Sequence, residues 1–99
     1  MNKEEALATI SEMESFLDEF GAPNDAALRT IKRSVFALKC RDGYFNGKLD
    51  EFESWAKIGL STRKFQQWGV DRVKHSARCD LSMARQLIQE WPTFPPPSS

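Results

Sequence analysis

The chain has 99 residues, and its 14 Lys and Arg residues balance its 14 Asp and Glu residues to a formal net charge of +0 at pH 7. Zero net charge excludes a protein that binds polyanions by bulk charge, and no apolar run approaches the roughly 18–20 residues of a membrane span. Because the N-terminal segment also lacks a hydrophobic signal core, we expect a cytoplasmic protein with no membrane partner. The length predicts one domain over 1–94 and a mobile Pro/Ser tail over 95–99.

The first predicted element is an amphipathic helix over 3–20, because apolar residues recur there every three or four positions. Its apolar stripe consists of Leu7, Ile10, Met13, Leu17 and Phe20. Gly21 accepts a left-handed cap conformation, and Pro23 cannot continue the helical hydrogen bonds, so the two residues predict the end of this helix.

A second helix is expected to begin at Asn24 or Asp25 and to end near Lys39 or Arg41. Its stripe is Leu28, Ile31, Val35 and Leu38, with Ala27 and Phe36 at the sides. The heptad-like spacing predicts one buried face on this helix.

Residues 42–47 have the composition of a turn, and we expect a loop there with Tyr44 or Phe45 folded back onto the core. The helical period returns at Leu49 and is broken at Gly59. The sequence therefore predicts a third helix confined to the stretch between them.

The last third of the chain is expected to contain two or three short helices. Ser61 can cap the first, and Gly69 interrupts it, so the stretch that follows either continues this helix or forms a separate one. A final helix begins near Asp80 or Ser82, and Pro92 ends it. The predicted fold class is all-α, a compact bundle of about five or six helices.

The segment 53–68 resembles the core of a helix-turn-helix DNA-binding unit. Its matching positions are Ile58, Gly59, Leu60, Ser61, Phe65 and Trp68. Gly59 permits the tight turn, and Ser61 caps the second helix. The apolar residues hold the two helices at a steep angle.

The resemblance implies that the second helix of this unit turns polar side chains toward DNA. The residues expected to contact base edges are Thr62, Arg63, Lys64, Gln66 and Gln67. Those expected to contact the DNA backbone are Ser61, Arg72, Lys74, His75 and Arg78. Arginine and glutamine form bidentate contacts with guanine and adenine edges, and basic side chains hold phosphates. A solvated cationic face, or one paired with the acidic first helix, is the structural alternative.

We therefore expect a small regulator or accessory factor that binds duplex DNA, as a homodimer because half-site recognition usually needs two copies. The alternative is a protein-binding adaptor or inhibitor module. That module would dock through its acidic first helix or through its basic 61–79 face.

No catalytic or cofactor-binding arrangement emerges from the sequence, so we expect a protein that is not an enzyme and carries no cofactor. The two cysteines, Cys40 and Cys79, stand in unrelated contexts, and His75 is the single histidine. A zinc site needs four clustered ligands, and the usual spacings of zinc ligands cannot be assembled from this sequence, so no metal site is predicted. Both cysteines are expected to be free thiols.

Overall fold

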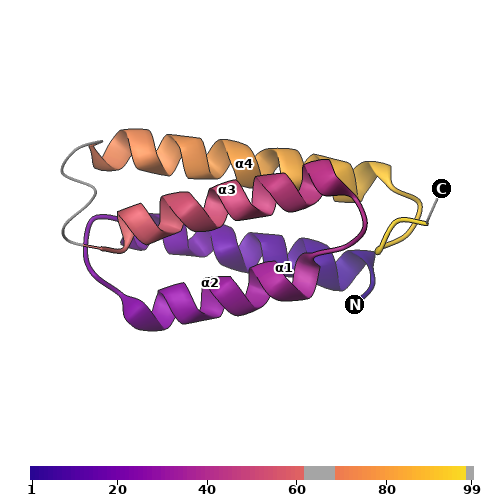
Figure 1. Cartoon of the computed structure of the whole chain (residues 1–99), viewed down its shortest axis with the longest axis horizontal. Helices are drawn as coiled ribbons and strands as arrows, with labels where there is room; N and C mark the ends of the chain where they lie inside the picture. Colours follow the sequence, from indigo (N-terminus) through magenta and orange to yellow (C-terminus); the bar gives the residue numbers. More distant parts are fainter. Residues whose placement is uncertain (62–68, 98–99) are drawn as a thin grey trace.

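The computed structural model describes residues 1–61 and 69–97, and within these ranges the chain is helical and contains no strand. The helices are α1 (Lys3–Ser15), α2 (Asp25–Leu38), α3 (Gly43–Gly59) and α4 (Val70–Glu90), and a short 3₁₀ helix, η1 (Phe16–Glu19), extends α1. Neighbouring helices run antiparallel in an elongated bundle, with α2 and α4 along opposite edges (Figure 1).

The all-α prediction is confirmed, but the described ranges hold four α-helices where the sequence predicted five or six. None of these helices combines the length and the apolar character that crossing a membrane requires.

The first helix begins at the predicted position, but its last residues form a 3₁₀ helix and not the predicted α-helix. Asn2 Oδ1 accepts the Glu5 N–H at 2.8 Å, and Glu5 Oε1 accepts the Asn2 N–H at 3.1 Å. This reciprocal capping box satisfies two amides at the helix start. The α-helical hydrogen bonding stops at Ser15 and tightens into η1, and Gly21, at φ +109°, completes the turn that the sequence predicted.

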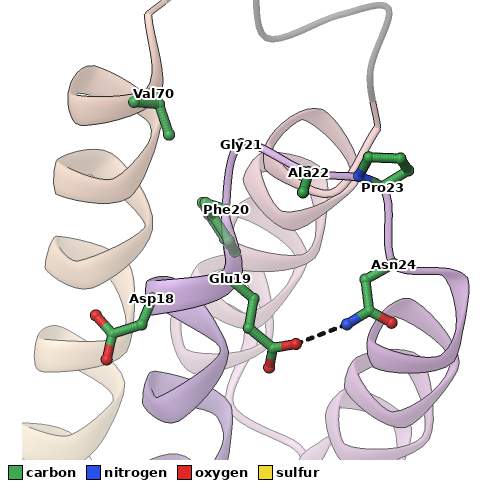
Figure 2. A pocket seen from close by; sticks show the side chains of 8 residues that line it. All are labelled: Asp18, Glu19, Phe20, Gly21, Ala22, Pro23, Asn24 and Val70. Carbon is green, nitrogen blue, oxygen red and sulfur yellow. Dashed lines mark hydrogen bonds between the residues drawn. The ribbon is translucent and has the colours of Figure 1, made fainter.

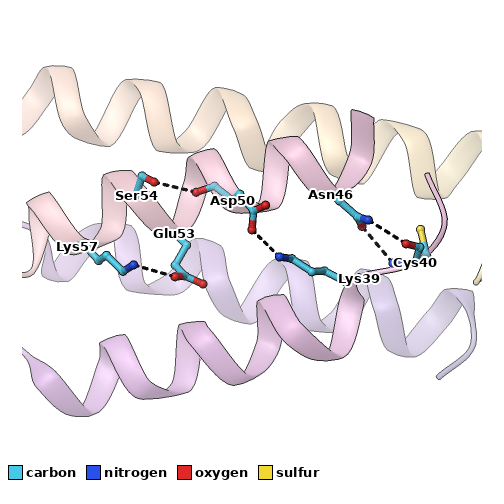
Figure 3. Close-up of polar contacts among 7 residues, drawn as sticks. All are labelled: Lys39, Cys40, Asn46, Asp50, Glu53, Ser54 and Lys57. Atoms are coloured by element: carbon cyan, nitrogen blue, oxygen red, sulfur yellow. Dashed lines mark hydrogen bonds and ion pairs between the residues drawn. The ribbon is translucent and has the colours of Figure 1, made fainter. Parts of the chain in front are cut away.

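The segment 42–47 is the first turn of α3, so the predicted loop is wrong. Asp42 Oδ1 accepts the Phe45 N–H at 2.8 Å and caps the helix. The Asn46 amide holds the preceding backbone, since its Oδ1 accepts the Cys40 N–H at 3.1 Å and its Nδ2 donates to the Cys40 carbonyl at 2.8 Å (Figure 3). The expectation that Tyr44 or Phe45 packs onto the core is confirmed, because Phe45 is buried.

A single continuous helix, α4, occupies the region where the sequence predicted a new start at Asp80 or Ser82. It begins after Gly69, whose φ of +79° lies in the left-handed region that glycine tolerates. Its buried positions are Val73, Ala77, Asp80, Leu81, Ala84 and Ile88. Because these positions follow the helical period without a gap, the predicted boundary is wrong.

The residues after α4 fold back over the end of the bundle. Phe94 is buried, and its ring centroid lies 6.0 Å from that of Phe45 and 6.3 Å from that of Trp91. Lys3 Nζ donates to the Trp91 carbonyl at 2.8 Å, which fastens the C-terminal segment to the start of α1. These contacts close the core at the end of the bundle where both termini lie (Figure 1).

Gly59 marks the closest approach between the end of α3 and the turn after η1. The Gly21 N–H donates to the Gly59 carbonyl at 2.7 Å, and a Cβ at Gly59 would lie 2.6 Å from Cγ of Phe20. We expect Gly59→Ala to lower the free energy of unfolding by about 1–3 kcal/mol, because the buried ring has to move. Denaturant titration measures this loss.

Gly47→Ala is the matched control, because Gly47 is also helical and its added Cβ meets nothing within 4 Å. This variant is expected to gain about 0.5–1 kcal/mol from helix propensity. Equal changes in the free energy of unfolding of Gly59→Ala and Gly47→Ala would contradict the close approach of Gly59 to the Phe20 ring.

Candidate functional site

The helix-turn-helix prediction depends on residues that lie outside the described ranges. These are the five expected base-contacting residues, Thr62, Arg63, Lys64, Gln66 and Gln67, and the two apolar residues of the second helix, Phe65 and Trp68. Ile58 and Gly59 form the last turn of α3, and Leu60 is its C-terminal cap. The structure thus describes the first half of the expected unit, and the recognition helix stays a prediction.

The expected phosphate contacts that the structure describes do not gather into one free cationic patch. Lys74 Nζ lies 3.9 Å from Asp18 Oδ1, so this cation faces the acidic end of η1. His75 Nε2 contacts Cys79 Sγ at 3.6 Å, one helical turn away. Arg78 is exposed and forms no ion pair with any described residue. Of the other residues expected to contact the DNA backbone, Ser61 is half-buried and Arg72 is exposed.

Several acidic side chains of the first helix region are engaged inside the molecule. Glu14 pairs with Arg85 of α4, and Glu19 Oε1 accepts a hydrogen bond from Asn24 Nδ2 at 2.6 Å. Part of the acidic charge of α1 and η1 therefore serves to join elements of the bundle. An ion pair between Lys74 and Asp18 also joins the basic 61–79 segment to this acidic region.

A different surface carries cations that have no acidic partner within residues 1–61 and 69–97. Arg29, Lys32, Arg33 and Phe36 recur at helical spacing on α2, and we call them the outer face of α2. The buried positions of this helix, Ala27, Ile31, Val35 and Leu38, lie on its opposite side. The Phe36 side chain is 83% exposed, so its predicted place beside the apolar stripe is wrong. A single exposed apolar side chain is common on protein surfaces, so it is the combination of Phe36 with three cations on one helix face that makes this face a candidate for binding.

Both ends of α2 are fixed, which holds its outer face in place. Asn24 Oδ1 accepts the Ala27 N–H at 3.0 Å, and the Asn24 N–H donates to the Leu60 carbonyl at 3.2 Å. At the other end, Lys39 Nζ lies 2.8 Å from Asp50 Oδ1 of α3 (Figure 3). The outer face is therefore presented on a helix anchored at two points.

Cations on α3 differ from those on α2 in having counter-ions. Lys57 Nζ lies 3.1 Å from Glu53 Oε2, and Lys48 Nζ lies 3.2 Å from Glu51 Oε2 (Figure 3 shows the first pair). The three cations of the outer face form no ion pair or side-chain hydrogen bond with any described residue. Asp25, in the first turn of α2, suits the positive end of the helix dipole. No acidic side chain in the described part of the chain therefore forms an ion pair with the cations of the outer face.

The sequence contains a signal for this face outside the segment that resembles a helix-turn-helix unit. The stretch 22–41 contains five basic residues and one acidic residue. Positions 29, 32, 33 and 36 also fall opposite the predicted apolar stripe of the second helix. Combining the charge count with the helical period would have placed Phe36 among cations on the solvent side.

A buried carboxyl group lies between α3 and α4. Asp80 is buried, and its Oδ2 has no hydrogen-bond partner among the described residues. Burial raises the pKa of Asp80 to about 7, together with the hydrogen bond that the protonated carboxyl group donates to the nearby Glu51 carboxylate. The same hydrogen bond lowers the pKa of Glu51. A proton on Asp80 can be donated to Glu51, which relieves the repulsion between the two carboxylates.

This carboxyl pair predicts a pH dependence of stability. Asp80 has a higher pKa in the folded chain than its ordinary 3.8, so the folded state binds more protons than the unfolded state between these values. Stability is therefore expected to fall as the pH rises from 5 to 8. Asp80→Asn retains a donor toward Glu51 and removes the titration, so its melting temperature should change less than that of the wild type between pH 5 and pH 8. A wild-type melting temperature that is highest at pH 8 would contradict the proton assignment.

A shallow pocket of about 600 Å³ opens at the turn between η1 and α2 (Figure 2). Its lining residues are Asp18, Glu19, Phe20, Gly21, Ala22, Pro23, Asn24 and Val70. The charged members of this lining are both carboxylates, so the pocket does not suit a phosphate. The Glu19–Asn24 hydrogen bond along the pocket wall joins the two ends of this turn, so these lining residues have a structural role.

Comparison with known proteins adds no assignment: no protein-family model matches the sequence, and no curated protein or solved structure matches it significantly.

Proposed function

We propose that this protein is a small DNA-binding regulator or accessory factor that contacts duplex DNA through the outer face of α2. The observation that carries the proposal is a set of three cations that pair with no described residue, on the same helix face as a Phe36 side chain that is 83% exposed. Each side chain of the set has a known use on DNA. Arginine reads guanine edges, lysine holds phosphate, and phenylalanine contacts the thymine methyl group.

The shape of the surface also supports the proposal. Helix α2 lies along an edge of the bundle (Figure 1). A helix with its side chains is about 10–12 Å across, and the major groove is about 12 Å wide. An edge helix with its cations turned outward can therefore approach the groove.

The segment 61–79 remains a second proposed contact region for the same function. It includes the expected recognition helix and the exposed Arg78. Because α4 and α2 lie along opposite edges of the bundle, one short duplex would engage one of these regions at a time. Substitutions in each region therefore distinguish the two.

The direct experiment is a fluorescence anisotropy titration of a random-sequence duplex at several salt concentrations. On a random-sequence duplex the two arginines, like the lysine, are expected to contact phosphates. Three phosphate contacts predict that affinity falls about 40-fold between 50 and 200 mM salt, since the logarithm of the binding constant falls by about 0.9 per contact per decade of salt. Absence of binding at about 50 mM salt would contradict the proposal, because electrostatic binding is strongest there.

A protein-binding adaptor or inhibitor is the second candidate, and the exposure of Phe36 favours it specifically. Aromatic and arginine side chains dominate the binding energy of protein interfaces. The partner would present an acidic surface to the outer face of α2. A protein that binds no DNA in the titration and whose cellular partner is lost on Phe36→Ala would support this candidate.

A further inference from the structure

The exposed side of α4 carries a pair of metal-ligating side chains. His75 and Cys79 are one helical turn apart, both are exposed, and His75 Nε2 lies 3.6 Å from Cys79 Sγ. Cys79 is a free cysteine. Imidazole nitrogen and thiolate sulfur are the donors that Zn²⁺ prefers in structural sites.

The separation of the two donor atoms matches a tetrahedral zinc site. Bonds of about 2.3 Å to sulfur and about 2.0–2.1 Å to nitrogen, at a tetrahedral angle, place the donors about 3.5–3.6 Å apart. His75 and Cys79 already stand at this distance. One ion can therefore bind both side chains with little rearrangement of α4.

We propose that His75 and Cys79 form half of a zinc site that a second copy of this chain completes. Within the described residues no group of three or more histidine, cysteine or acidic side chains can hold a metal ion, so one chain supplies two ligands. Two copies related by a two-fold axis supply two imidazoles and two thiolates. The dimer therefore supplies the four ligands of a tetrahedral zinc site, of which one chain supplies two.

The charge balance favours this composition. Zn²⁺ displaces one proton from each Cys79 thiol, and the two thiolates cancel the charge of the ion. Each assembled site therefore carries no net charge and releases two protons to solvent. The pair lies on α4 and the outer face lies on α2, so loss of zinc binding and loss of duplex binding through α2 are separate outcomes.

The test adds Zn²⁺ to the metal-free full chain in a non-thiol reductant, which prevents disulfide formation. Light scattering after gel filtration is expected to show the mass doubling, with one zinc bound per two chains. Co²⁺ in place of zinc is expected to give the visible absorption of a tetrahedral thiolate site. Binding of one ion per chain with no change in mass, or no binding, would overturn the proposal.

Two variants and one matched control assign the ligands. His75→Ala and Cys79→Ser are each expected to abolish the zinc-dependent dimer and the Co²⁺ spectrum. Both residues are exposed, so the fold should persist, which circular dichroism checks. Cys40→Ser changes the other cysteine, which lies half-buried between α2 and α3, and is expected to leave both signals unchanged. A dimer that survives Cys79→Ser and is lost in Cys40→Ser would also overturn the assignment.

Discussion

Replacing Phe45 with alanine is expected to lower the free energy of unfolding by about 3–5 kcal/mol. The Phe45 ring is fully buried, and its centroid lies 5.1 Å from that of Trp91, so the cavity opens where α3 meets the C-terminal segment. A domain of this size has a total stability of about 5–15 kcal/mol, and the substitution removes a large fraction of it. Urea or guanidinium titration followed by circular dichroism measures the change.

Phe36→Ala is the matched control, since it makes the same chemical change at a side chain that is 83% exposed. Its expected effect on the free energy of unfolding is within about 0.5 kcal/mol. Similar losses of unfolding free energy in Phe45→Ala and Phe36→Ala would contradict the burial of Phe45 and the exposure of Phe36.

The second large effect is expected in DNA binding. The triple substitution Arg29→Gln, Lys32→Gln and Arg33→Gln should weaken duplex binding at about 50 mM salt by at least about 100-fold, at about 1 kcal/mol or more for each contact. It should also remove most of the salt dependence, because fewer counterions are released. The fold should persist, since none of the three side chains is buried or paired with a described residue.

The control for total charge combines Arg41→Gln with Lys57→Glu, which lowers the net charge by the same three units. Both positions are exposed, and neither lies on the outer face of α2 or in the segment 61–79. The Lys57–Glu53 ion pair that it breaks lies at the surface and contributes about 0–1 kcal/mol. The affinity of this variant is expected to fall less than about tenfold, from long-range electrostatics. Equal losses in this variant and in the triple variant would exclude the outer face as the contact surface.

The apolar period predicted the parts of the fold that it directly encodes. The stripes through Ile10 and Ile31 correctly placed the buried faces of α1 and α2, because burial at helical spacing appears directly in the sequence. The start of α2 at Asn24 was also predicted, because an asparagine cap is a local signal. The end of α3 at Gly59 was predicted from the break in the same period.

The errors arose where a turn or cap residue was read as a boundary although the helix includes it. Asn46 belongs to a helix because Asp42 caps the start of α3 and the Asn46 amide binds the backbone of Cys40. Helix α4 runs through Asp80 because its buried apolar positions keep the helical period on both sides of that residue, whereas an aspartate was read as a helix start. The environment of Phe36 depends on where α2 sits in the bundle, so a search for local motifs did not identify it.

The central claim is that the outer face of α2 is where this protein contacts DNA. Titrating an isotopically labelled sample with a short duplex, and following backbone amide shifts by NMR, tests it most directly. The proposal predicts that the largest shifts fall on the helical turns carrying Arg29, Arg33 and Phe36. Largest shifts in the first turns of α4, around Arg78, would contradict it, and so would a spectrum that the duplex leaves unchanged.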